Sequence, residues 1–219
     1  MEVKMYQYIL FDLDGTLTDP REGITKSVQY ALTKMGIDEP DLSALEHFIG
    51  PPLYDEFRRC YGFDDIEAKQ AVAAYRERFS VTGWKENLLF DSVPDMLQSL
   101  HSAGKILAIA SSKPKVFVEK ILNYFDIAKY FDVISGATLD GSISTKAQVV
   151  EQALQWLSVS DKSKAVLVGD RMHDVEGAQS CLIDCVGVTF GFGGLQELQR
   201  AGATRIVQDF SQLLEVLTN

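Results

Sequence analysis

Short apolar runs recur along the chain, and each is followed by a pattern with helical spacing. Such runs are typical of parallel strands that are covered on both faces. The expected strands are 8–11, 106–110, 133–135, 165–168 and 185–188. The expected crossover helices are 94–103, 115–125, 147–157 and 175–181. The pattern therefore predicts an α/β fold with a doubly wound parallel sheet.

A different pattern separates the first expected strand from Asp91. About 65 residues there have helical spacing and no strand pattern, as expected for an amphipathic helical segment. Gly50, Pro51 and Pro52 predict a turn inside it, because the helical pattern resumes at Leu53. We expect a small all-helical domain, 18–84, inserted after the first strand of a core formed by 1–17 and 85–219. Its apolar face is formed by Ile24, Val28, Ala31, Leu32 and Met35, and a more charged helix is expected at 66–79.

The net charge of the chain limits the kinds of macromolecule that it is expected to bind. The formal net charge is -10, which disfavours a nucleic-acid or anionic-membrane surface because phosphate-rich partners would be repelled. No run of about 18 apolar residues occurs, and residues 1–8 lack the apolar stretch of a secretory signal. These features predict a cytoplasmic protein with no nucleic-acid and no membrane partner.

The cysteines and histidines show no spacing typical of a metal site. An odd number of cysteines without zinc-type pairing favours reduced thiols that are buried as small hydrophobic groups. The cysteines are Cys60, Cys181 and Cys185, and the histidines are His47, His101 and His173.

Two aspartates directly follow the first expected strand. Ligands of open α/β sheets bind beyond the carboxyl ends of the strands, so Asp12 is expected to point into that crevice. Alternation along the chain places Asp14 on the same side as Asp12, and Gly15 allows the chain to turn sharply afterwards. An acidic turn without chemistry is the alternative for this pair alone.

Other strand ends carry polar residues that suit phosphoryl transfer. Strand 106–110 is followed by Ser111 and Ser112, strand 165–168 is followed by Asp170 with Asp174 one helical turn later, and Lys146 opens a helix. Taken singly, these residues could be helix caps or solvated charges.

Together, the four aspartates would meet at one edge of the sheet. Each pair of carboxylates 4 Å apart costs about 4 kcal/mol at an effective dielectric constant near 20, so a bound cation is required. Ligands that are all oxygens indicate a hard cation, and phosphate chemistry favours Mg²⁺.

With these motifs in order, the chain resembles the haloacid dehalogenase superfamily and, within it, the phosphoglycolate-phosphatase-like branch. Residues 12–16 match the nucleophile motif, Ser111 the second motif and Lys146 the third. Gly169 and Asp170 with Asp174 match the fourth motif. The resemblance covers the whole chain and implies a Rossmann-like catalytic core with a helical cap.

The resemblance implies a role for each core residue. Asp12 attacks phosphorus, and Asp14 acts as general acid and then general base. Ser111 and Lys146 stabilise the transferring phosphoryl group. Mg²⁺ is held by Asp12, the Asp14 backbone carbonyl and Asp170, with Asp174 nearby. Gly15, Thr16 and Ser112 are implied to contact phosphate.

Two positions depart from the family pattern. Ser112 stands where the family commonly has Asn, and Ala147 stands where it often has Pro. Neither change removes a catalytic group. In the cap, the resemblance and the need to bind an acidic substrate point to Arg21, Gly50 and Arg58.

The sequence predicts a Mg²⁺-dependent phosphatase that hydrolyses a small phosphorylated metabolite through an aspartyl-phosphate on Asp12, similar to phosphoglycolate phosphatases. A 5'-nucleotidase acting on nucleoside monophosphates and a β-phosphoglucomutase-type phosphotransferase remain as alternatives. A non-catalytic phosphoacceptor module is a further alternative, and it would not need Asp14 or a cap. A monomer or a homodimer is expected.

Overall fold

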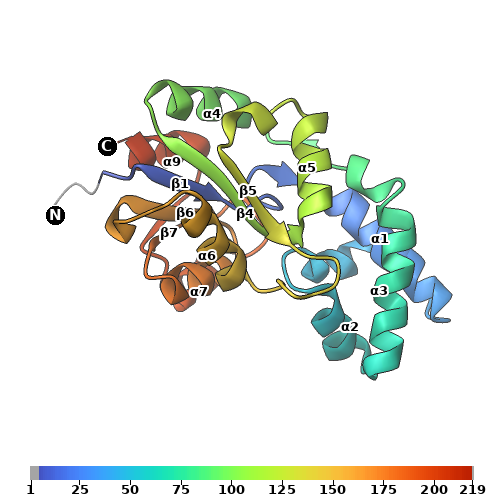
Figure 1. Ribbon diagram of the computed structural model, residues 1–219. Coiled ribbons are helices and arrows are strands. Elements are labelled where there is room, and N and C mark those ends of the chain that lie inside the picture. Colours follow the sequence, from blue (N-terminus) through green and yellow to red (C-terminus); the bar gives the residue numbers. More distant parts are fainter. Residues whose placement is uncertain (1–4, 219) are drawn as a thin grey trace. The chain divides into compact units, whose positions relative to one another are not determined.

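Six parallel strands form one sheet in the computed structural model, which describes residues 5–218 (Figure 1). The strands lie in the order β5-β4-β1-β6-β7-β8. Their bounds are β1 Tyr8–Phe11, β4 Ile106–Pro114, β5 Val133–Ala137, β6 Ala165–Gly169, β7 Asp184–Val188 and β8 Arg205–Val207. The predicted α/β fold with a doubly wound parallel sheet is confirmed.

The strand order reverses beside β1. The chain runs outward from β1 through β4 to β5, and then returns to the other side of β1 with β6. Phe11 is level with Ile109 of β4 and with Val168 of β6. The residues just beyond these three therefore lie at the same edge of the sheet, which is where open α/β sheets bind their ligands.

Helices cover both faces of this sheet. Helices α6 (Lys146–Trp156) and α7 (Met172–Ser180) pack on the face that carries Leu10, Ala108 and Leu167. Figure 1 shows α4 and α9 across the sheet from α6 and α7. The other helices around the sheet are α4 Val93–Ser102, α5 Lys115–Tyr124, α8 Gly194–Ala201, α9 Phe210–Thr218, and the short η3 Ala128–Tyr130 and η4 Lys162–Lys164.

The chain divides into two compact units. One consists of 1–19 and 89–219 and holds the six-stranded sheet; the other is 20–88. We call them the sheet unit and the helical unit. The helical unit contains α1 Arg21–Lys34, η1 Leu42–Phe48, α2 Leu53–Tyr61, α3 Asp65–Phe79 and η2 Gly83–Lys85. The predicted core range also includes 1–4 and 219, which lie outside the described residues.

Packing of α1 against α3 organises the helical unit. The predicted apolar face of α1 is buried at Ile24, Val28, Ala31 and Leu32. Gly23 is needed near its start, because a Cβ there would lie 2.0 Å from the Gly83 carbonyl oxygen.

Three expectations for this architecture were wrong. Two short strands, β2 (Thr18–Asp19) and β3 (Leu88–Leu89), pair where the chain passes between the units, in a region where no strand was expected. A two-residue strand is too short to show an alternating pattern. The edge strand β8 was missed for a similar reason, since it has three residues. Cys60 is exposed, whereas Cys181 and Cys185 are buried as expected.

The helices were compared with the length and apolarity that a membrane span needs. Among the described residues, none of them is both long and apolar enough to span a bilayer.

Candidate active site

The turn after β1 holds Asp12 and Asp14 at the edge of the sheet. The Asp12 amide donates to the Val168 carbonyl (2.9 Å), which continues the ladder one residue beyond β1. Gly15 has a φ of +82°, and a Cβ on it would lie 2.3 Å from a carboxylate oxygen of Asp170. Only glycine avoids both problems, so the turn depends on Gly15.

Lys146, at the start of α6, connects the end of β1 to the first turn of α7. Its Nζ lies 2.8 Å from Asp12 Oδ1 and 2.8 Å from Asp174 Oδ1, and it donates to the Ala110 carbonyl (3.0 Å). Thr145 and Gln148 form a capping box, which makes Lys146 the first residue of α6. The side chain is almost fully buried, so this ammonium depends on its two carboxylates for its charge balance.

Asp170 and Asp174 are held by backbone amides. Asp170 Oδ2 accepts from the Phe192 amide (2.7 Å), and Asp174 Oδ2 accepts from the Arg171 amide (3.0 Å) at the start of α7. Thr16 Oγ1 donates to Asp170 Oδ1 (3.5 Å). The contact of Thr16 with phosphate, which was expected from the sequence, stays a prediction.

Negative charge exceeds positive charge in this cluster. Oxygens of Asp12, Asp170 and Asp174 all lie within 4.8 Å of one another, and Lys146 neutralises one of the three charges. Burial and the nearby Asp174 and Asp12 carboxylates raise the pKa of Asp170 well above its usual value. Burial also raises the pKa of Asp174, although Lys146 opposes this rise. Burial works against the charged form of Lys146, but Asp12 and Asp174 outweigh it and raise its pKa.

This donor set suits Mg²⁺. The three carboxylates are buried and present only oxygen atoms, which hard cations prefer. With one ammonium beside them, two negative charges are left, matching a divalent cation. Asp12, Asp170 and Asp174 fit the metal role expected from the sequence; for the Asp14 backbone carbonyl that role stays a prediction.

Lys113 was not singled out from the sequence. Its ammonium forms a buried ion pair with Asp14 Oδ2, 99 residues away in the chain. Burial raises the pKa of Asp14, and Lys113 opposes the rise more strongly than any other neighbour. The sequence signal that could have identified Lys113 is its position two residues after Ser111, still within strand β4.

The glycine-rich loop 191–193 closes around Asp170. A Cβ on Gly191 would lie 2.3 Å from Asp170 Cβ, and a Cβ on Gly193 would lie 2.2 Å from the Asp170 carbonyl oxygen. In the sequence, Gly191, Gly193 and Gly194 resemble a phosphate loop, but no strand-to-helix context with a lysine follows. The structure gives the loop another partner. Its observed role is to hold a carboxylate, through the Phe192 amide.

Ser111 and Ser112 lie near the end of β4, the strand beside β1. Ser111 is 2% exposed, and its Oγ accepts from the Lys113 amide (3.3 Å). Ser112 is partly exposed. Their contacts with phosphate stay predictions.

The three residues expected to recognise substrate in the helical unit have other partners or roles there. Arg21 Nε lies 2.9 Å from Glu46 Oε1, and Arg58 lies 3.4 Å from Asp65. Gly50 has a φ of +108° in the turn that precedes α2. Substrate contact by these residues stays a prediction.

Comparison with protein families identifies a match over residues 9–188 to the model described as haloacid dehalogenase-like hydrolase. A 5'-nucleotidase of Pseudomonas aeruginosa is 48% identical over 97% of this chain and 96% of its own length. The tyrosine-protein kinase PtkA of Mycobacterium tuberculosis is 39% identical over 90% of this chain and 67% of its own. A phosphoglycolate phosphatase of Colwellia psychrerythraea is 26% identical over 98% of both chains.

A solved structure has the same fold along almost its whole length. The crystal structure of a predicted phosphatase from Clostridium acetobutylicum superposes with a TM-score of 0.94 at 45% identity. The match covers 96% of this chain and 97% of the other.

We expect Gly15→Ala to disrupt the carboxylate cluster. A left-handed φ costs a non-glycine residue about 1–2 kcal/mol, and here the added methyl also collides with Asp170. Gly104→Ala is the matched control, because Gly104 has a φ of +74° with no atom within 4 Å of the added Cβ. The melting temperature should fall further in Gly15→Ala, and calorimetry should show weaker Mg²⁺ binding in that variant alone. Equal losses in the two variants would contradict the collision with Asp170.

Proposed function

We propose a mechanism and a substrate class for this chain, which belongs to the haloacid dehalogenase-like hydrolase family and is a phosphoric monoester hydrolase. Asp12 is the nucleophile, and the reaction passes through an aspartyl-phosphate. The observation that carries the proposal is the buried cluster of Asp12, Lys146, Asp170 and Asp174 at the ends of β1 and β6.

In the first step an oxygen of the Asp12 carboxylate attacks phosphorus and forms an O–P bond. The bond from phosphorus to the leaving oxygen breaks, and the carboxyl group of Asp14 donates its proton to that oxygen. Burial of Asp14 supports this role because it raises the pKa and favours the protonated form. Lys146 lies beside Asp12 and offsets the negative charge of the incoming phosphoryl group.

In the second step water attacks the phosphorus of the aspartyl-phosphate. Asp14, now a carboxylate, takes a proton from the water, and the O–P bond to Asp12 breaks to release inorganic phosphate. Lys113 stabilises this charged form of Asp14 through their ion pair. Lys113 is therefore suited to balance the two protonation states that Asp14 needs in turn.

Magnesium is the proposed cofactor, held by Asp12 and Asp170 with Asp174 beside them. When bound, it supplies positive charge that lets an anionic carboxylate and an anionic phosphate approach each other. The excess of carboxylates over ammonium groups in the cluster supports this assignment.

We place nucleoside 5'-monophosphates first among the substrates. The 5'-nucleotidase is 48% identical to this chain, whereas the phosphoglycolate phosphatase is 26% identical. The activities named are those of the two relatives, and the ranking of substrates for this chain is our proposal.

We assign bond cleavage to the sheet unit and substrate preference to the helical unit. The expected core of 1–17 and 85–219 and the expected cap of 18–84 differ from these two units by two residues at one boundary and four at the other. The support is that Asp12, Asp14, Lys146, Asp170 and Asp174 all belong to the sheet unit. Arg21, Gly50 and Arg58 are the candidates for recognition of the leaving group.

Asp12→Asn should lower the rate of phosphate release by more than about a thousandfold, because an amide cannot form the phosphoryl ester. Acid quenching during turnover of a ³²P-labelled ester should trap a labelled protein in the wild type and none in Asp12→Asn. Asp95→Asn, at an exposed position on α4, is the control and should behave as the wild type. Turnover of Asp12→Asn within tenfold of the wild type would remove Asp12 from the nucleophile role.

Lys113→Met should lower turnover by about tenfold to a hundredfold, since the buried Asp14 carboxylate loses its ion pair and its fixed orientation. Lys115→Met is the control, because Lys115 is more exposed and pairs with Glu119 on the same helix. Steady-state rates on one ester compare the two variants. If both retain full turnover, the Asp14–Lys113 pair does not contribute to catalysis.

A panel of phosphomonoesters tests the substrate class. Phosphate release is measured for nucleoside 5'-monophosphates, phosphoglycolate and a sugar phosphate, with Mg²⁺ and with excess chelator. We expect kcat/KM to be at least about tenfold higher for a nucleoside monophosphate, a difference of about 1.4 kcal/mol. Chelation should stop the reaction, and Mg²⁺ should restore it. Preference for another ester refutes the ranking, and a requirement for a bisphosphate activator identifies a mutase instead.

A further inference from the structure

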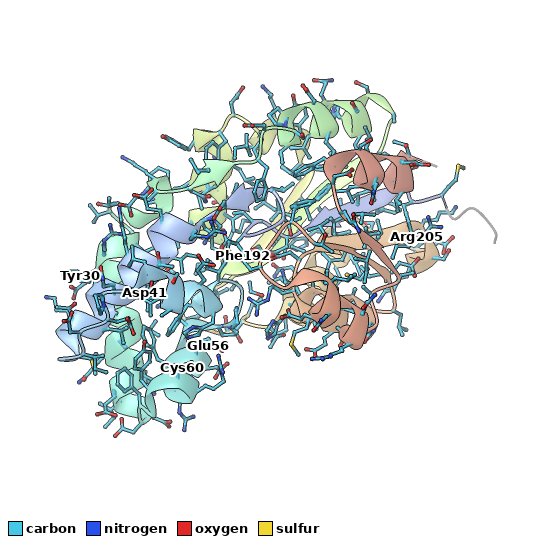
Figure 2. All side chains as sticks on the ribbon, turned by 180° about the vertical axis from the view of Figure 1, so that it is seen from behind. Tyr30, Asp41, Glu56, Cys60, Phe192 and Arg205 are labelled. Atoms are coloured by element: carbon cyan, nitrogen blue, oxygen red, sulfur yellow. The ribbon has the colours of Figure 1, made fainter. Side chains whose placement is uncertain are left out.

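Three side chains of different chemistry, none of which takes part in the proposed bond cleavage, meet in the helical unit. Cys60 Sγ lies 3.1 Å from His47 Nε2 and 3.6 Å from Glu56 Oε2, and His47 Nε2 lies 4.0 Å from Glu56 Oε2. Glu56 and Cys60 are four residues apart on α2, which places them on one face of the helix, and both are labelled in Figure 2. His47 comes from η1, on the other side of the turn at 50–52.

The orientation of His47 suits a metal ligand. Its Nδ1 lies 2.8 Å from the Ala44 carbonyl oxygen, which can only accept a hydrogen bond. Nδ1 therefore donates this hydrogen bond, and in the neutral ring Nε2 carries the lone pair, which faces Cys60 and Glu56. Metal-binding histidines are typically held in this way, by a hydrogen bond from the second ring nitrogen to a carbonyl or carboxylate.

Glu56 is also held in place. It is 6% exposed, and Arg59 donates to both of its carboxylate oxygens, at 3.1 and 2.6 Å. Each oxygen has two lone pairs, so Oε2 can accept from Arg59 and still bind a cation. A hydrogen-bonded carboxylate is common in the surroundings of a metal site.

The spacing of the three donor atoms matches a tetrahedral site. Ligands at the usual zinc distances and a tetrahedral angle lie about 3.3–3.7 Å apart. The three observed separations, 3.1, 3.6 and 4.0 Å, lie around this range. Small movements of exposed Cys60 and partly exposed His47 would bring all three separations into this range.

We propose that His47, Glu56 and Cys60 form a second metal site, which binds one Zn²⁺ ion. One nitrogen, one oxygen and one sulfur ligand suit a borderline-soft cation, in contrast to the all-oxygen cluster around Asp12. A thiolate 3.6 Å from the Glu56 carboxylate is unfavourable without a cation, and a divalent ion removes the repulsion. Three protein ligands leave a fourth position for water.

Binding of one Zn²⁺ ion releases one proton. The neutral imidazole gives its Nε2 lone pair, Glu56 is already a carboxylate, and the Cys60 thiol releases its proton to the solvent as the S–Zn bond forms. His47 and Glu56 lie on opposite sides of the turn 50–52, so the ion would link η1 to α2 and restrict this turn.

Cobalt serves as the spectroscopic probe for the zinc site. The full chain is freed of metal and then titrated with Co²⁺ in excess Mg²⁺, so that the carboxylate cluster is supplied with its own ion. We expect one Co²⁺ per chain and a sulfur-to-cobalt charge-transfer band, which Zn²⁺ removes by displacement. Cys60→Ser and His47→Gln should abolish the band and weaken binding at least tenfold. Cys181→Ala and His101→Gln should leave it unchanged.

A second measurement does not depend on the variants. Alkylation of the wild type followed by peptide mass spectrometry should show Zn²⁺ slowing the modification of Cys60 by at least tenfold. Melting curves of Cys60→Ser and His47→Gln are the control that checks whether these variants are folded. The site is refuted by the absence of a band, by a band that persists in Cys60→Ser, by one metal for two chains, or by unchanged alkylation with Zn²⁺. The result is separable from the phosphatase mechanism, because Asp12→Asn should bind Co²⁺ like the wild type.

Discussion

The contact on which the sheet unit depends is the buried ammonium of Lys146 between the carboxylates of Asp12 and Asp174. It connects the end of β1, the start of α6 and the first turn of α7. Breaking such a buried pair by removing one partner typically costs about 3–5 kcal/mol, because the remaining charge has no solvent to stabilise it. The backbone around it must therefore be shaped to keep these groups together.

Glycines provide that shape. A Cβ on Gly15 or Gly191 would overlap Asp170, one on Gly169 would overlap Asp174, and one on Gly177 would overlap the Lys146 side chain. These glycines come from four different places in the chain, yet each makes room for the same charged cluster. The backbone approaches the cluster so closely that it supplies amide donors, as at Phe192.

The two proposed metal-binding clusters differ in their donor atoms and in their burial. The cluster around Asp12 is buried and contains only oxygen donors, so it suits a hard cation that works on phosphate. The cluster of His47, Glu56 and Cys60 reaches the surface and mixes nitrogen, oxygen and sulfur. The two proposed cation sites therefore differ in the softness of their donor atoms and in burial.

The sequence by itself determined five of the six strands of the sheet, the expectation of a helical insertion and the positions of the charged residues near the strand ends. These follow from local patterns: apolar runs become strands, and the residue after a strand lies at the sheet edge whatever its neighbours are. Tertiary structure alone decided which side chains pair. Lys113 meets Asp14 across 99 residues, the 191–193 loop closes on Asp170, and His47 meets Cys60 across a turn. Such contacts depend on how the helices, strands and loops pack against one another, and the pattern of apolar and polar residues along the chain does not specify that packing.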